Sequence, residues 1–159
     1  MKVKTEERFM KRFCVLLLII LSMGSTAGFA QSNSGLDAIL DQEKVEFSSA
    51  VYLALSAAEL IEETATAEEA MGALAASGWG FPVEAPAEIT LGQYSYLLMK
   101  AFNIPGGLMY RMFPGPRYAT REAAYLGFVT DRPTPTRNLS GEEAVRMLGA
   151  VLTWKEDRS

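Results

Sequence analysis

The sequence predicts an all-α fold, with about five helices in one domain behind an N-terminal leader. Two observations indicate helices: apolar residues recur at helical spacing in the longer segments, and helix-capping patterns stand before three of them. No stretch alternates convincingly between apolar and polar residues, so strands are at most short. The chain has 159 residues and is 49% hydrophobic, which is enough for a single domain with its own core.

Residues 1–30 predict a secretory signal peptide. Five basic residues precede an apolar run over 13–23, and small residues stand at the −3 and −1 positions before Gln31. The run is shorter than the roughly 20 residues that span a bilayer, although an uncleaved membrane anchor is the alternative. We therefore expect an exported protein, periplasmic or associated with the cell envelope. The rest of the chain divides into a lead-in over 31–44, one helical domain over 45–154 and a tail over 155–159.

Composition excludes several classes of function. The chain has no His, and its one Cys, Cys14, lies in the leader, so His-based triads, Cys–His pairs, His-ligated zinc and disulfides are excluded from the exported part. Residues 31–88 carry eleven acids and one base, whereas residues 89–159 carry six acids and nine bases. The acidic balance argues against nucleic-acid binding. Either the two halves attract each other, or a basic surface on the C-terminal half meets an anionic partner.

The first long helix is predicted over 47–62, where apolar residues recur every three or four positions. A short helix follows Thr66, because Thr66 and Glu69 have the spacing of a capping box. Gly78 and Pro82 are expected to end this helix.

Two further long helices repeat one design fifty residues apart. The first begins after Thr90 and the second after Ser140, each with a Gln or Glu three positions later that suits a capping box. A short helix is predicted between them, over 119–129. The apolar stripes of the two long helices match position for position: Tyr94, Leu97, Leu98, Ala101 and Phe102 in one, and Ala144, Met147, Leu148, Val151 and Leu152 in the other. A unit of short helix, loop and long helix therefore fills 45–154 in about two and a half copies.

This unit resembles the S-layer homology (SLH) repeat, in which a short helix and a loop lead into an Ile-Thr-Arg-x-Glu-like helix start. Residues 89–94 and 139–144 match that start in pattern. The resemblance implies a helical-repeat architecture and residence in the cell envelope. The family's Arg after the Thr helps to hold a cell-wall polysaccharide, but here Leu91 and Gly141 occupy that position. The glycan-binding role therefore does not carry over residue by residue.

The adjacent glutamates at 62–63, 68–69 and 142–143 do not predict acid/base pairs. Neighbouring residues on a helix point about 100° apart and do not share a site. Glu69 and Glu143 also have the capping position. No phosphate-binding or calcium-binding motif occurs, so we predict no cofactor, no metal and no catalytic residues.

The most unusual stretch is 104–118, IPGGLMYRMFPGPRY, which is rich in Gly and Pro and also in Met, Tyr and Arg. In one interpretation it is a buried connection that fills the core with four apolar side chains: Leu108, Met109, Met112 and Phe113. In the other it is a partner surface, because Tyr, Met and Arg are enriched at interfaces. Arg111 and Arg117 suit carboxylates or phosphates. The candidate binding residues, including aromatic faces for a glycan, are Trp79, Tyr110, Arg111, Phe113, Arg117 and Tyr118.

The sequence thus predicts an exported, non-enzymatic cell-envelope protein that binds an envelope protein or a wall polymer through 104–118 and the basic C-terminal half. One alternative is a helical carrier or chaperone for an apolar ligand, with the Met-rich segment as a lid. Another is a small wall hydrolase that uses carboxylates, which would require a buried Glu facing a cleft.

Overall fold

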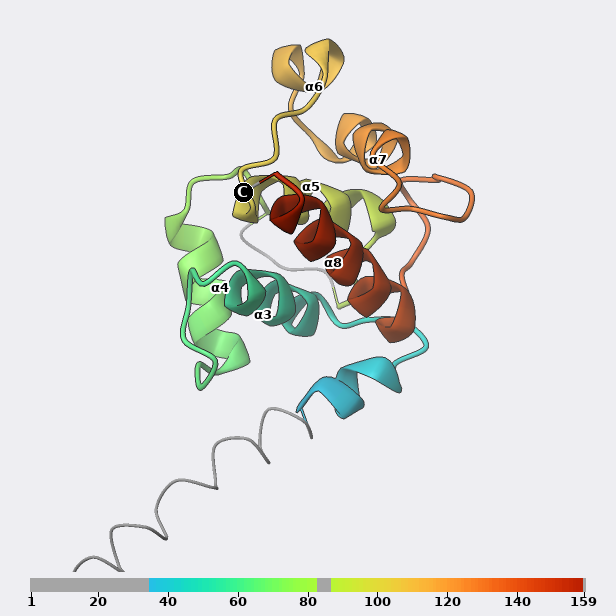
Figure 1. Cartoon of the computed structure of the whole chain (residues 1–159). Coiled ribbons are helices and arrows are strands. Elements are labelled where there is room, and N and C mark those ends of the chain that lie inside the picture. Colours follow the sequence, from blue (N-terminus) through green and yellow to red (C-terminus); the bar gives the residue numbers. More distant parts are fainter. Residues whose placement is uncertain (1–34, 83–86, 159) are drawn as a thin grey trace, which may run out of the picture. The chain divides into compact units, whose positions relative to one another are not determined.

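The computed structural model describes residues 35–82 and 87–158, and Leu36–Ser159 form one compact unit. The all-α prediction is confirmed for these residues, in which isolated β-bridges occur but no strand. Residues 36–40 are helical. The named helices are α3 (Phe47–Ala57), α4 (Ala67–Ala76), α5 (Leu91–Ala101), α6 (Leu108–Met112), α7 (Pro116–Tyr125) and α8 (Gly141–Glu156) (Figure 1).

The predicted signal peptide lies outside the described residues, so it stays a prediction. In the part of the chain that the structure does describe, no helix is both long enough and apolar enough to cross a bilayer.

The core is centred on α5, which packs against α3, α7 and α8. Eight of its eleven residues are buried, so the helix is covered on nearly every side. Tyr94, Leu97 and Leu98 of the predicted stripe are fully buried, as expected. The Tyr94 hydroxyl donates to the carbonyl oxygen of Ala144 at 3.1 Å, which ties α5 to α8. Burial raises the pKa of this phenol above its ordinary value.

The segments that precede the three long helices lie side by side. Each contributes one apolar residue immediately before its helix cap or helix start, and Val45, Ile89 and Leu139 are all completely buried. The Val45 N–H donates to the Leu139 carbonyl at 2.8 Å, and the Ile89 N–H donates to the Val45 carbonyl at 2.9 Å. The long helices α3, α5 and α8 therefore start from one shared apolar centre.

The helix starts follow the capping signals closely. Thr66 and Thr90 each accept the backbone N–H three residues on, and the Glu69 and Gln93 side chains reach back to complete both capping boxes. The Glu69 carboxylate accepts hydrogen bonds from the backbone N–H and the hydroxyl of Thr66, and these two bonds hold the pKa of Glu69 below its ordinary value.

Three predicted boundaries were wrong, including the end of α7, which is Tyr125 rather than residue 129. Helix α3 ends at Ala57 rather than near residue 62, because Glu59 adopts a left-handed conformation with φ of 59° and the Leu60 N–H turns back to the Leu55 carbonyl at 2.9 Å. Helix α7 begins at Pro116, three residues before the predicted start, because proline is already shaped for a first helical position. The short helix α6 was not predicted.

The stripe of α8 holds from Ala144 to Val151, but Leu152 is 36% exposed. At this end of α8, Trp154 packs against the core in place of Leu152, and its ring contacts that of Phe128 with centroids 6.1 Å apart. Two helical positions correspond to a rotation of about 200°, so Leu152 points away from that contact.

The start of α8 rests on the chain before α3. The Gly141 N–H donates to the Gln42 carbonyl at 2.9 Å, and a Cβ at Gly141 would overlap with the carbonyl oxygen of Ile39. Ile39 itself is buried. The end of the predicted lead-in therefore packs with the helices.

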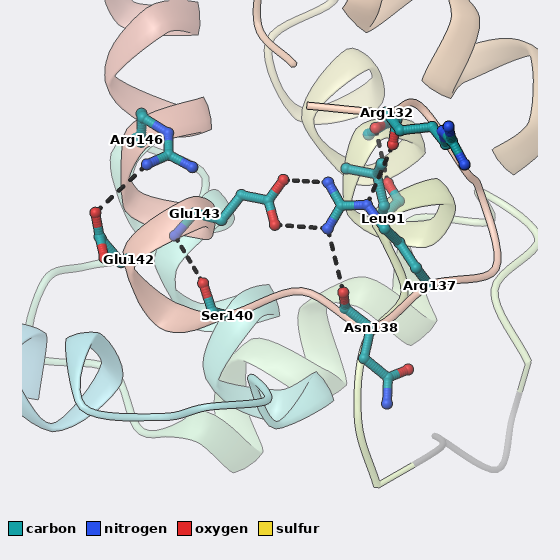
Figure 2. Close-up of polar contacts among 9 residues, drawn as sticks. Leu91, Arg132, Arg137, Asn138, Ser140, Glu142, Glu143 and Arg146 are labelled. Atoms are coloured by element: carbon teal, nitrogen blue, oxygen red, sulfur yellow. Dashed lines mark hydrogen bonds and ion pairs between the residues drawn. The ribbon is translucent and has the colours of Figure 1, made fainter. Parts of the chain in front are cut away.

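An arginine–glutamate pair closes the loop before α8. Figure 2 shows the Arg137 guanidinium facing the Glu143 carboxylate through both of its terminal nitrogens, with Nη1 at 2.7 Å from Oε2. The two side chains are 28% and 10% exposed. Ser140 caps the helix as predicted, at 3.2 Å from the Glu143 N–H. The expected return bond from Glu143 is not formed, because its carboxylate is taken up by Arg137.

Candidate functional site

The apolar residues of α6 and its C-cap face solvent. Leu108 is 71% exposed, Met109 51%, Met112 59% and Phe113 55%. The interpretation of this segment as a core-filling connection is therefore wrong for these four residues. Figure 1 shows why: α6 stands beside α7 at the edge of the helical unit, away from α3 and α4.

Tyr110 is the one residue of α6 that points inward. It is only 8% exposed, and its ring lies 6.3 Å from that of Tyr96 on α5. The Tyr96 ring also contacts the Phe81 ring, with centroids 5.4 Å apart. Burial, with a smaller contribution from Tyr96, raises the pKa of Tyr110 to about 12. Tyr110 therefore anchors α6 to the core and does not offer an open face to a glycan.

Trp79 lies apart from α6. It is half-buried after the end of α4, and its backbone carbonyl accepts a hydrogen bond from the Tyr96 hydroxyl at 3.0 Å. Trp79 and Tyr110 each contact the buried Tyr96, which lies between them. The two residues predicted to stack on a glycan therefore do not line one surface.

A shallow hollow of about 260 Å³ lies between α6 and α7. Tyr118 forms part of its wall and packs on Phe113, with ring centroids 6.3 Å apart. The Arg121 guanidinium carbon lies 6.0 Å from the centroid of the Tyr118 ring, within reach of a cation–π contact. The lining residues are Gly107, Leu108, Met109, Tyr110, Tyr118, Arg121 and Glu122.

Arg121 and Glu122 are the functional candidates that sequence reasoning missed. They belong to a Thr-Arg-Glu run in the middle of α7. A simpler signal was available, because residues 118, 121, 122 and 125 fall at i, i+3, i+4 and i+7 and so share one side of α7. Tyr125, the last of them, is 84% exposed.

The exposed residues of α6 and α7 combine apolar tips with positive charge. Arg111, Arg117 and Arg121 are all exposed, and the one acid between residues 106 and 125 is the half-buried Glu122. We call the α6–α7 surface the set of Leu108, Met109, Arg111, Met112, Phe113, Arg117, Tyr118 and Arg121. Four of the six predicted binding residues, namely Arg111, Phe113, Arg117 and Tyr118, belong to this surface.

Carboxylates line two hollows in the described part of the chain. Among the described residues that line the hollow between α6 and α7, one carries a carboxylate, Glu122. A second, more open hollow of about 470 Å³ at the α3–α4 turn is lined in part by Glu59, Glu62 and Glu63, and all three are exposed. Within the described ranges, no group of three or more residues suited to a metal ion occurs.

Comparison with known proteins adds no further assignment: no family model, curated protein or solved structure matches the chain.

Proposed function

We propose that the chain is an exported, non-enzymatic cell-envelope protein that binds an envelope component through the α6–α7 surface. One observation carries the proposal: four large apolar side chains that are 51–71% exposed stand among three exposed arginines. Contiguous exposed apolar residues with a polar rim mark interaction sites on soluble domains. Met and Arg are also among the residues enriched where proteins meet partners.

Two features support a location in the envelope. The leader has the pattern of a secretory signal. A repeated helical unit of the SLH-like kind is supported by the buried centre that Val45, Ile89 and Leu139 form, because each of these apolar residues stands before a long helix. The arginine position of the SLH start is still filled by Leu91 and Gly141, so the proposal places binding on the α6–α7 surface.

The two alternative functions have less support. A carrier needs a cavity that encloses its ligand, and ligand pockets have volumes of about 300–1,000 Å³. The hollow beside α6 is smaller and its rim is exposed, and the hollow of about 470 Å³ at the α3–α4 turn is more open still, so neither encloses a ligand. A carboxylate-dependent hydrolase needs two acids set across a cleft. The hollow beside α6 offers Glu122 alone among its lining residues, and the three glutamates that line the hollow at the α3–α4 turn are all exposed.

Cell fractionation tests the proposal with the full-length chain expressed in its own host. We expect the wild-type protein to sediment with the envelope, and the Leu108→Ser/Met109→Ser variant to appear in the soluble exported fraction. Leu60→Ser is the matched control, because Leu60 is also 51% exposed but lies on the α3–α4 turn. Equal retention of all three proteins, or retention of none, would refute the assignment. Digestion of the wall before sedimentation then separates a wall polymer from a protein or membrane partner.

A further inference from the structure

We propose that the partner of the α6–α7 surface is an anionic lipid bilayer, into whose interface the apolar residues of α6 insert. This inference rests on the proposed function and specifies its ligand. It concerns a shallow, reversible contact, since α6 has five residues and lies at the edge of the fold.

The placement of the apolar side chains favours insertion. Leu108, Met109 and Met112 occupy helical positions i, i+1 and i+4, so they project to one side, while Tyr110 projects to the other and is buried against Tyr96. Phe113 follows at the C-cap and is also more than half exposed. One side of α6 is therefore anchored in the core and the opposite side is an apolar tip, which is the arrangement of an interfacial membrane anchor.

The charges around that tip suit an anionic surface. Arg111 lies within α6, and Arg117 and Arg121 lie on the adjacent α7, so three exposed cations are carried by the helix of the apolar residues and its neighbour. Residues 31–88, in contrast, carry eleven acids and one base. This charge asymmetry would turn the arginine-bearing side toward negatively charged headgroups and keep the acidic helices away from them.

The exposed side of α7 continues the same pattern. Tyr118 and Tyr125 stand seven residues apart on one side of the helix, with Arg121 between them. Tyr125 is 84% exposed. Tyrosines with an apolar ring and a polar hydroxyl are enriched at the level of lipid headgroups, next to basic residues that contact phosphate.

Other occupants fit this surface less well. A wall polysaccharide gains little from Leu108 and the methionines, because sugars are recognised by hydrogen bonds and flat aromatic faces. A second copy docked symmetrically would bring the positively charged surface that carries Arg111, Arg117 and Arg121 against the same surface of its partner. A protein partner would need an acidic apolar groove, and such a partner is the alternative outcome of the test.

Vesicle flotation tests the inference with purified residues 31–159, which contain the compact unit Leu36–Ser159 and omit the apolar leader. The probes are vesicles of phosphatidylcholine alone and vesicles with one third phosphatidylglycerol. Each arginine near an anionic surface contributes about 1 kcal/mol, or about fivefold in binding. We therefore expect Arg111→Ala/Arg117→Ala to bind the anionic vesicles about 30-fold more weakly. Arg132→Ala, which removes an exposed arginine from the loop before α8, should bind like the wild type.

A second readout locates the inserted residue. Residues 31–159 contain no Cys, so Met112→Cys and Leu60→Cys each accept one environment-sensitive dye. The Met112→Cys dye should shift to the blue with anionic vesicles, and the Leu60→Cys dye should not. Thermal unfolding of each variant confirms that the fold is retained.

Three results would overturn the inference: equal binding to both vesicle types, an unchanged spectrum at Met112→Cys, or no vesicle binding at all. If vesicle binding is absent while fractionation still shows envelope retention that depends on Leu108 and Met109, the proposed function stands and the partner is a protein or a wall polymer. If both are absent, the proposed function fails as well.

Discussion

The pair Arg137–Glu143 allows a quantitative test of how the start of α8 is held. Arg137→Met removes the cation and leaves the Glu143 carboxylate, which is only 10% exposed, without its bidentate partner. The contact is strongly charge-assisted: the hydrogen bond to Glu143 is the main cause that raises the pKa of Arg137 above its ordinary value. We expect this variant to be strongly destabilised.

The magnitude follows from the burial of the two groups. Removing one partner of a fully buried ion pair costs about 3–5 kcal/mol. Arg137 is 28% exposed, so water enters part of the vacated space and the expected loss is about 2–3 kcal/mol. For a domain of this size, that loss lowers Tm by about 10 °C. Glu143→Leu should cost less, because the remaining guanidinium also donates to the carbonyl oxygens of Arg132 and Asn138 and reaches solvent.

The assay is a double-mutant cycle by urea and thermal unfolding. The double variant Arg137→Met/Glu143→Leu leaves no buried charge, so we expect it to be more stable than Arg137→Met alone, with a coupling energy of about 1–2 kcal/mol. Additive losses in the double variant would refute the reasoning, because they would mean that the two side chains stabilise the fold independently. A loss below about 0.5 kcal/mol for Arg137→Met would show that the pair is a surface contact.

Three other predictions concern the backbone and a buried phenol. Gly141→Ala should lower the free energy of unfolding by about 2–3 kcal/mol, because the added methyl group overlaps with the chain before α3. Gly149→Ala is the control: it has open space in the same helix and should raise the free energy of unfolding by about 0.5–1 kcal/mol. Similar unfolding midpoints for the two variants would contradict the close contact at Gly141. Glu59→Gly should stabilise by about 0.5–1 kcal/mol, because glycine adopts the left-handed conformation without the strain of a side chain; a lower Tm would count against it. The pKa of Tyr110 is raised to about 12, so the folded state keeps a proton that the unfolded state loses above pH 10, and stability falls as the pH rises from 10 to 12. Tyr110→Phe should reduce that slope by up to one proton, and an unchanged slope in unfolding experiments would disprove the assignment.

Local signals predicted the starts of the capped helices α4, α5 and α8, because a cap is decided by residues three positions apart. Thr66 with Glu69 and Thr90 with Gln93 formed the expected boxes. The same signal was incomplete at Glu143, because Arg137 offered its carboxylate a stronger partner than a backbone N–H. Helix ends were harder, since Glu59 is a residue type that rarely adopts a left-handed conformation and its sequence neighbourhood gives no sign of it.

The buried centre was partly predictable. Ile89 and Leu139 each stand immediately before a capped helix, which is the position of a hydrophobic staple. That Val45 joins them depends on hydrogen bonds to Ile89 and Leu139, which lie 44 and 94 residues further along the chain, and no local pattern encodes such contacts. The same limit applies to the packing of Ile39 against Gly141, which brings part of the expected lead-in into the fold.

The orientation of α6 is the point at which composition could not decide between core and surface. A Met- and Leu-rich segment suits either, and the outcome depends on how much room the core has left. The contact between Tyr96 and Tyr110 joins α6 to α5. Because α6 has five residues, Tyr110 is the one that this contact buries, and the other apolar side chains of the helix have no core surface to pack against. Leu108 and its apolar neighbours thus remain exposed, where they add little to the free energy of folding and favour aggregation in water. Folding therefore does not account for their presence, and this is the reason why we propose a contact outside the chain.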